Sequence, residues 1–398
     1  MDAALSGDGP GFEPLLAPEG WAYASMLPVE DGDPGRFHAL FGRDSLIFAL
    51  QVLPVRPAIA HATLRALAAL QGRVDDAEID EEPGKIIHEY RPVAPAWLVK
   101  AGWPVRDGGI RYYGTADATS WFLVLLAAAR DAALAAEFEA AWRAAAGWLE
   151  RRLDRGDGLV RHGPRTHPGG LVQQGWRDAL DPAHDPYGHG ILRPDGTVPT
   201  APLADADSQA AAVAALHALA VLDPRQAGRW RERADALRAR ITAAFAPEVM
   251  ALEAGDVVVP GAGSQLGWLL WADALEGPAA HAAAERLIQG DVLTPFGLRT
   301  LSSEHPVFTP HAYHRGTVWP FDNWLGWGGL RALGYRDAAE RVRTGVHIAL
   351  DRLGRAPELY SVTPAGGLEP VAISNRVQAW TVGATWALAA QWDGRVRD

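Results

Sequence analysis

The arrangement of short and long links between helical stretches most constrains this fold. Apolar residues recur at three- and four-residue spacing, the period of an amphipathic helix, in about eleven stretches. Short links such as Leu222-Asp223-Pro224 and Gly334-Tyr335 join these stretches into pairs. Short links favour antiparallel helix hairpins. The predicted helices are roughly 38–54, 57–72, 115–133, 135–153, 202–221, 224–246, 263–275, 278–290, 315–333, 336–354 and 375–392.

The links between pairs are long and rich in Gly, Pro, Trp, His and acidic residues, and such links are uncommon unless they carry function. Alternating short and long links place the long ones at one end of a ring of hairpins. The pattern therefore predicts an all-α fold, an (α/α)6 barrel whose long loops form the cleft. A helix in the first 37 residues or near 94–100 would be the twelfth, and short strands are expected in the loops, for example at 256–259.

Composition narrows the class of protein. The hydrophobic content of 48% and charged content of 21% are typical of a globular protein. A net charge of −11 argues against a nucleic-acid partner, and the absence of cysteine excludes disulfides and thiolate metal ligands. No secretion signal or membrane-spanning run is visible, so no membrane partner and a cytoplasmic location are expected. We expect one catalytic domain over residues 1–398, with 1–15 as a flexible arm; the sequence does not indicate the oligomeric state.

Sixteen tryptophans divide into two groups by their surroundings. Four lie in helical patterns and are expected in the core or on helix surfaces: Trp142, Trp148, Trp230 and Trp271. Five lie near segments dense in Gly, Pro, His and acidic residues and are candidates for a ligand cleft: Trp103, Trp176, Trp319, Trp324 and Trp380.

Two carboxylates stand in aromatic segments of different long links. Asp178 ends the run Gln-Gly-Trp-Arg-Asp, and Glu358 lies in Pro-Glu-Leu-Tyr. Glycoside hydrolysis needs two carboxyl groups, one to donate a proton and one to act as base or nucleophile. Trp176 would exclude water from Asp178 and raise its pKa, as a general acid requires.

Further polar clusters are candidates for binding a sugar, although ordinary ion pairs, helix ends or loop networks would explain each one alone. Arg43 and Asp44 open the first helix, where charged groups could bind sugar hydroxyls. The pattern H-E-x-x-H is absent at His88, so neither a metal nor another cofactor is predicted. The remaining candidates are His88, Glu89, Arg91, Tyr113, Asp117, Gln174, Trp176, His314, Arg315, Trp319, Asn323 and Tyr360.

In this order, the motifs resemble the amylo-α-1,6-glucosidase (glycogen-debranching-type) catalytic domain and the related glycoside hydrolases of family 63. The shared runs are Phe-Gly-Arg-Asp-Ser, His-Glu-x-Arg, Tyr-Tyr-Gly-x-x-Asp-Ala-Thr, Gln-Gly-Trp-x-Asp, His-Arg-Gly-x-Val-Trp-Pro-x-Asp-Asn and Pro-Glu-Leu. The resemblance implies an (α/α)6 barrel and inverting hydrolysis, with Asp178 as acid and Glu358 as base. It places Arg43, Asp44, Trp319 and Asn323 around the cleaved sugar.

Three departures accompany the resemblance. A histidine often found in the Ser-x-x-Gly-His region is replaced in the run Ser264-Gln265-Leu266-Gly267-Trp268. The N-terminal β-sandwich of many debranching-type proteins has no room here, and the Glu-x-Gln helix motif appears as Asp207-Ser208-Gln209. We therefore expect an inverting α-glycosidase acting on a small α-linked glucoside or mannoside or on an α-glucan end. One alternative is a sugar epimerase or isomerase using His88, His311 or His314. Another is a carbohydrate-binding protein without turnover.

Overall fold

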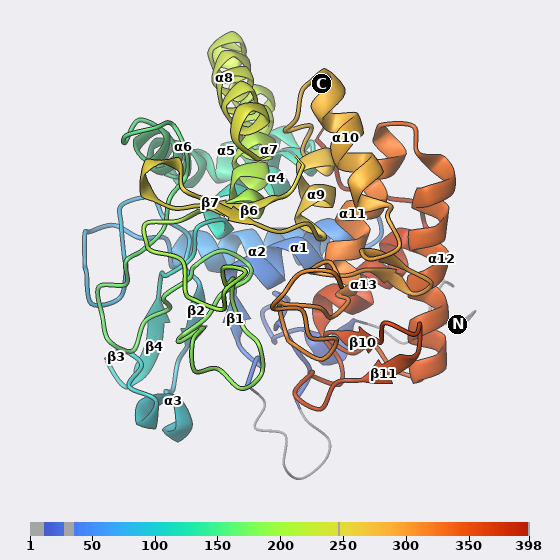
Figure 1. The fold of residues 1–398 in the computed structure, drawn as a ribbon. Coiled ribbons are helices and arrows are strands. Elements are labelled where there is room, and N and C mark those ends of the chain that lie inside the picture. Colours follow the sequence, from blue (N-terminus) through green and yellow to red (C-terminus); the bar gives the residue numbers. More distant parts are fainter. Residues whose placement is uncertain (1–11, 28–35, 246, 397–398) are drawn as a thin grey trace.

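The computed structural model describes residues 12–27, 36–245 and 247–396 and is mostly helical. The described residues hold thirteen α-helices, named in Figure 1: α1 (Gly42–Val52), α2 (Pro57–Ala69), α3 (Ala96–Lys100), α4 (Ala118–Ala128), α5 (Ala132–Glu137), α6 (Glu139–Leu153), α7 (Ala206–Leu222), α8 (Ala227–Phe245), α9 (Gln265–Trp271), α10 (Gly277–Leu287), α11 (Pro320–Ala332), α12 (Arg336–Leu353) and α13 (Ala379–Ala389). None of these helices is long and apolar enough to cross a membrane.

Six helices contact one another in a closed cycle. Along the chain, α1 packs on α4, α4 on α7, α7 on α9, α9 on α11, α11 on α13, and α13 returns to α1. A second set packs outside this cycle, each helix against its partner in the chain: α2 on α1, α6 on α4, α8 on α7, α10 on α9 and α12 on α11. This pairing is the one that the short links predict.

Composition explains which helices lie inside. Every position of α1 is buried, and α4, with the sequence ATSWFLVLLAA, is buried over nearly its whole length. Outer α12 instead buries only one face and presents charged residues on the other. A helix that is apolar all round needs neighbours on every side, whereas an amphipathic helix covers a surface. Of the two positions expected for the tryptophans in helical patterns, core or helix surface, all four take the core: Trp142, Trp148, Trp230 and Trp271.

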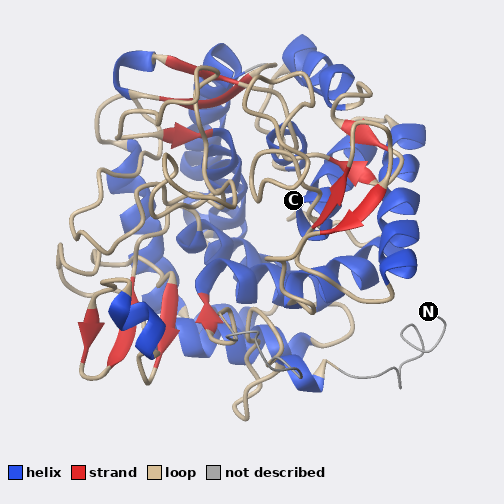
Figure 2. Cartoon of the chain, turned by 60° about the horizontal axis from the view of Figure 1, so that its bottom comes forward, coloured by secondary structure: helices blue, strands red, loops and turns tan. Residues whose placement is uncertain are grey.

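The long links carry short antiparallel strands. β1 (Leu40–Phe41), β2 (Glu89–Arg91), β4 (Gly109–Tyr112) and β3 (Val105–Arg106) form a sheet in the order β1-β2-β4-β3. A second sheet joins β5 (Ala204–Asp205), β6 (Val249–Leu252) and β7 (Val258–Pro260). Two hairpins complete the set: β8 (Leu293–Thr294) with β9 (Gly297–Leu298), and β10 (Tyr360–Val362) with β11 (Leu368–Pro370). Figure 2 shows loops and strands gathered on the face that is turned forward.

The predicted helices are confirmed with adjusted ends, and three details differ. The stretch 135–153 divides at Phe138, where α5 ends and α6 begins. Helix α3, near the predicted 94–100, lies beside the β3–β4 strands rather than among the hairpins (Figure 1). Residues 1–11 of the predicted arm at 1–15 lie outside the described residues. Its last part forms the 3-10 helix Glu13–Leu15, whose Leu15 is buried, so the prediction is wrong there.

Candidate active site

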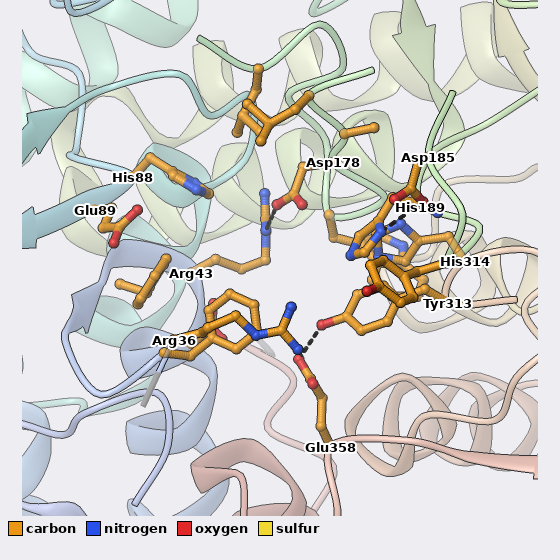
Figure 3. A pocket seen from close by; sticks show the side chains of 18 of the residues that line it. Arg36, Arg43, His88, Glu89, Asp178, Asp185, His189, Tyr313, His314 and Glu358 are labelled. Carbon is orange, nitrogen blue, oxygen red and sulfur yellow. Dashed lines mark hydrogen bonds and ion pairs between the residues drawn. The ribbon is translucent and has the colours of Figure 1, made fainter. Parts of the chain in front are cut away.

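A pocket of about 380 Å³ lies among the long links. Its walls come from the start of α1 and the segment before it, from β2, from α3 and Trp103, from the link that follows α6, from the segment before α11, from Glu358 and from the start of α13. Both predicted carboxylates line it. Figure 3 shows the side chains of Asp178 and Glu358 pointing into this space from opposite walls, with Arg43 to one side.

Asp178 is held by a loop rather than by a helix. Gln173 and Ala179 pair as an isolated antiparallel bridge, and this turn carries Asp178 toward the pocket. Its Oδ2 lies 3.4 Å from Nη1 of Arg43. Burial raises the pKa of Asp178, while the charges of Arg43 and His189 oppose this rise. A raised pKa favours the protonated carboxyl that a general acid needs.

Arg43 is fixed by a second carboxylate beneath the pocket. Its Nε donates to both Asp117 oxygens, at 2.8 and 2.9 Å, and both side chains are buried. Asp117 stands at the N-cap of α4, where the helix dipole also favours a negative charge. Asp117 is thus a partner of Arg43 and does not line the pocket.

Glu358 has a different set of partners. The Tyr313 hydroxyl donates to Oε1 at 2.5 Å, and the backbone N–H and the side-chain amide of Asn375 donate to Oε2 at 3.3 and 3.4 Å. Burial raises the pKa of Glu358 to about 8, while these hydrogen bonds and the charge of Arg36 favour its ionised form. These donors orient the Glu358 carboxylate, which lines one wall of the pocket.

Asp44 is connected to Glu358 through two amides. Asn375 donates to Gln378 at 2.9 Å, and Gln378 donates to Asp44 Oδ1 at 3.2 Å. Asp44 lines the pocket in the first turn of α1, and burial raises its pKa to about 7 against the charge of Arg43. Glu358 and Asp44 therefore occupy one connected wall.

Aromatic rings line part of the pocket. Trp176 contacts the rings of Trp319 and His314 edge to face, with centroids 5.3 Å apart in both cases. Trp319 donates its indole N–H to the Tyr313 carbonyl at 2.9 Å, so its ring plane is fixed. The predicted cleft tryptophans Trp103, Trp176, Trp319 and Trp380 line the pocket. Trp324 does not, because its indole donates to the Trp392 carbonyl inside the core; the prediction for this residue is wrong.

The three candidate histidines differ in position. His88 and His314 line the pocket, and burial lowers the pKa of each well below its ordinary value. His314 Nδ1 also accepts the backbone N–H of Gly190 at 3.0 Å. His311 is exposed and pairs with Glu369 at 2.8 Å away from the pocket. Glu89 also lines the pocket, where it is bonded to Arg91.

Six other predicted site residues, besides Asp117, lie behind the pocket walls. Arg91 bonds Glu89 and the Arg36 carbonyl, and Arg315 donates to the His189 carbonyl at 2.9 Å. These two residues support pocket residues from outside. Gln174 bonds Asp80 at 3.1 Å, beside the pocket segment but not in its lining.

The side chains of Tyr113, Asn323 and Tyr360 form hydrogen bonds with backbone groups of other segments. The Tyr113 hydroxyl donates to the Leu70 carbonyl at 2.6 Å, and that of Tyr360 to the Phe296 carbonyl at 2.6 Å. Asn323 accepts from the Leu298 N–H at 2.6 Å and donates to the Leu298 carbonyl at 3.1 Å, which anchors β9 to α11. None of these three side chains lines the pocket.

The structure adds pocket residues that the sequence analysis did not select. They are Arg36, Phe37, Phe41, Trp97, Leu98, Leu171, Ala179, Leu180, Asp181, His184, Asp185, Tyr187, His189 and Tyr313. His189 Nδ1 lies 2.8 Å from Asp185, and its ring stacks on Tyr313 with centroids 4.0 Å apart. The run His-Asp-Pro-Tyr-Gly-His at 184–189, inside a predicted long link, is the signal that could have identified part of this set.

Two carboxyl groups that face one aromatic-lined pocket match what glycoside hydrolysis requires. A family model described as the mannosylglycerate hydrolase MGH1-like glycoside hydrolase domain matches residues 41–356, and the chain belongs to this family. The resemblance to family 63 is thereby confirmed. A hydrolase is favoured over the epimerase and over the binding protein without turnover. No curated protein matches the chain.

Solved structures of similar fold cover nearly the whole chain. The family 63 mannosylglycerate hydrolase from Thermus thermophilus in complex with Tris has 16% sequence identity and a TM-score of 0.66, over 95% of this chain and 98% of that one. The structure of the same enzyme with Tris and D-glycerate has 17% sequence identity and a TM-score of 0.65, over 95% of this chain and 98% of that one. The structure of this enzyme with glucose has 18% sequence identity and a TM-score of 0.64, over 93% of this chain and 96% of that one.

Proposed function

We propose that this glycoside hydrolase inverts the anomeric centre of a small α-linked glucoside or mannoside, inside an (α/α)6 barrel. The observation that carries the proposal is the pair Asp178 and Glu358 in one pocket, on opposite walls and with unlike partners. Asp178 lies beside the cation Arg43, whereas Glu358 accepts hydrogen bonds from Tyr313 and Asn375. Unlike surroundings for two carboxyl groups are how one site provides both an acid and a base.

In the proposed reaction, protonated Asp178 donates its proton to the glycosidic oxygen as the bond to the anomeric carbon breaks. Ionised Glu358 takes a proton from a water molecule, whose oxygen attacks the anomeric carbon from the opposite face. Tyr313 and Asn375 orient the Glu358 oxygens toward that water. Inverting enzymes separate the two carboxyl groups by about 6.5–9.5 Å to leave room for the water.

The pocket favours a short substrate. Its volume of about 380 Å³ lies near the lower end of small-molecule sites, which span about 300–1,000 Å³. Trp176, Trp319 and Trp380 offer apolar faces for the C–H side of a pyranose, and Asp44 and Arg43 offer partners for hydroxyls. The neighbouring mannosylglycerate hydrolase was solved with glucose and with D-glycerate. We therefore include α-mannosyl- and α-glucosyl-glycerate among the substrates to be tested first.

A substrate screen followed by product analysis tests this function. α-Glucosides, α-mannosides and the two glycerate conjugates are incubated with the enzyme, and release of reducing sugar is measured. For the substrate that is cleaved, NMR in the first minutes should show the β-anomer of the freed sugar, because attack opposite to the leaving group inverts the centre. An initial α-anomer would mean a retaining mechanism, and interconversion of a free sugar without hydrolysis would favour the epimerase.

Asp44 is expected to bind the sugar that is being cleaved. Asp44→Ala should lower kcat/KM by about ten- to a hundredfold, because a hydrogen bond to a charged group contributes about 1.5–3 kcal/mol. The control is Asp131→Ala, which removes the N-cap of α5, where Asp131 accepts from Ala133 N–H at 2.8 Å. Loss of a cap costs about 1 kcal/mol of stability. We expect the control to lower Tm with normal kinetics; normal kinetics in Asp44→Ala would remove this residue from the site.

A further inference from the structure

Arg177 stands between two pocket residues but points away from the pocket. Trp176 and Asp178 on either side of it line the pocket, whereas the Arg177 side chain does not and is only 2% exposed. Its guanidinium lies over the Trp176 ring, 4.5 Å from the centroid. The proposed reaction gives this buried cation no chemical step.

The guanidinium is bound by elements that belong to the ring of helices. Nη1 pairs with Asp207 in the first turn of α7. Nη2 donates to the hydroxyl of Ser264, the N-cap of α9, at 3.0 Å, and to the Thr300 carbonyl at 3.4 Å. One side chain thus joins the 176–178 segment to the beginnings of two helices and to the residues after β9.

A second buried carboxylate adjoins this cluster. Asp322, in the first turn of α11, accepts the indole N–H of Trp268 at 2.6 Å. Burial raises the pKa of Asp207 to about 7 and that of Asp322 to about 6, and in both the charge of Arg177 opposes the rise. Desolvating such a cluster is costly, so stability alone is a weak reason for its presence. A stronger reason is the position of the cluster, since its cation Arg177 is the chain neighbour of Asp178.

The carboxyl of Asp178 is itself weakly held. It is 27% exposed, and its contact with Arg43 is long, at 3.4 Å. Its position therefore depends on the backbone that carries it, and the neighbouring side chain Arg177 fixes that backbone. We propose that Arg177 is a positioning residue for the catalytic acid, which it places by tying the 176–178 segment to the starts of α7 and α9. This inference rests on the proposed role of Asp178.

The test compares two substrates that differ in their need for an acid. One is the best glycoside with an alcohol leaving group from the substrate screen; the other is the α-glycosyl fluoride of the same sugar. Fluoride leaves with little proton donation, so a displaced acid should slow the first substrate and spare the second. For Arg177→Met we expect kcat on the glycoside to fall about a hundredfold with KM within about twofold, because small displacements of reacting groups have effects of this size. The rate on the fluoride should stay within about threefold.

Two further variants separate positioning from folding. Arg177→Lys keeps the charge and should recover part of the glycoside rate. Arg193→Met is the matched control, since Arg193 lies in the same link, pairs with Glu253 at 2.6 Å and does not line the pocket; it should leave both rates unchanged. If Arg177→Met does not fold, Arg177→Met combined with Asp207→Asn, which removes the unpaired carboxylate, is measured in its place.

The outcomes are distinct. A folded Arg177 variant with a normal glycoside rate would overturn the inference, and so would an equal loss on both substrates, which would indicate general damage to the pocket. A wild-type enzyme that cleaves neither substrate would instead contradict the proposed function. A selective loss on the glycoside, partly restored by lysine, supports the positioning role.

Discussion

Asp178→Asn should lower kcat on a glycoside with an alcohol leaving group by about two to four orders of magnitude, the usual contribution of a general acid. Asparagine keeps the shape of the side chain, but its amide is too weak an acid to transfer a proton to the glycosidic oxygen. Because it still fills the same space beside Arg43, the Tm should change little. Steady-state kinetics and a thermal melt measure the two effects.

The α-glycosyl fluoride is the internal control for this variant. Its leaving group needs little protonation, so Asp178→Asn should retain most of the wild-type rate on it. More than about a tenth of the wild-type rate on the alcohol glycoside would exclude Asp178 as the acid. Equal losses on both substrates would instead assign this residue to sugar binding.

Glu358→Gln should lower the rate on both substrates by a similar two to four orders of magnitude, because water must be activated whichever group leaves. Glutamine can still accept from Asn375 through its carbonyl oxygen while its amide N–H donates to the Tyr313 hydroxyl oxygen, so the pocket should remain formed. Retained binding of the free sugar, measured by calorimetry, is the control. A Glu358→Gln enzyme that hydrolyses the fluoride at the wild-type rate would contradict the assignment of the base.

The wild-type pH profile is part of the same prediction. A base works only when it is ionised, and burial raises the pKa of Glu358 to about 8. The acid limb of kcat/KM for the free enzyme should therefore rise with pH and lie well above the ordinary glutamate pKa of about 4.3. Profiles of kcat/KM over pH 4 to 9 measure this limb. A limb at the ordinary glutamate value would show that the carboxylate is better solvated than its burial implies.

The helices of this fold were predictable because their apolar periodicity is strong and their links differ in length. The prediction of a ring of hairpins needed only the alternation of those links. The structure adds the break at Phe138 and the placement of α3, since both depend on packing against distant segments. Local sequence does not encode such packing.

The candidate site was predictable where charge and aromatic residues coincide on a long link, as at Asp178 and Glu358. The prediction failed where the side chain of a motif residue points into the protein interior and not into the pocket. Tyr360 and Asn323 belong to the recognisable runs, but their polar atoms bond backbone carbonyls and N–H groups. Motifs identify the neighbourhood of a site and not the direction of each side chain. Tyr313 was missed for the opposite reason, because its contact with Glu358 spans 45 residues of chain.

The contact between α1 and α13 has a consequence for how the enzyme becomes active. Asp44 lies at the start of α1, while Trp380 in α13 lies near the other end of the described chain, and both line the same pocket. During synthesis the N-terminal hairpins emerge long before α13, and domains generally fold as units. A nascent chain that lacks α13 therefore lacks Trp380 and, with it, part of the wall of the candidate site. Hydrolytic activity is therefore expected only after α13 has packed against α1.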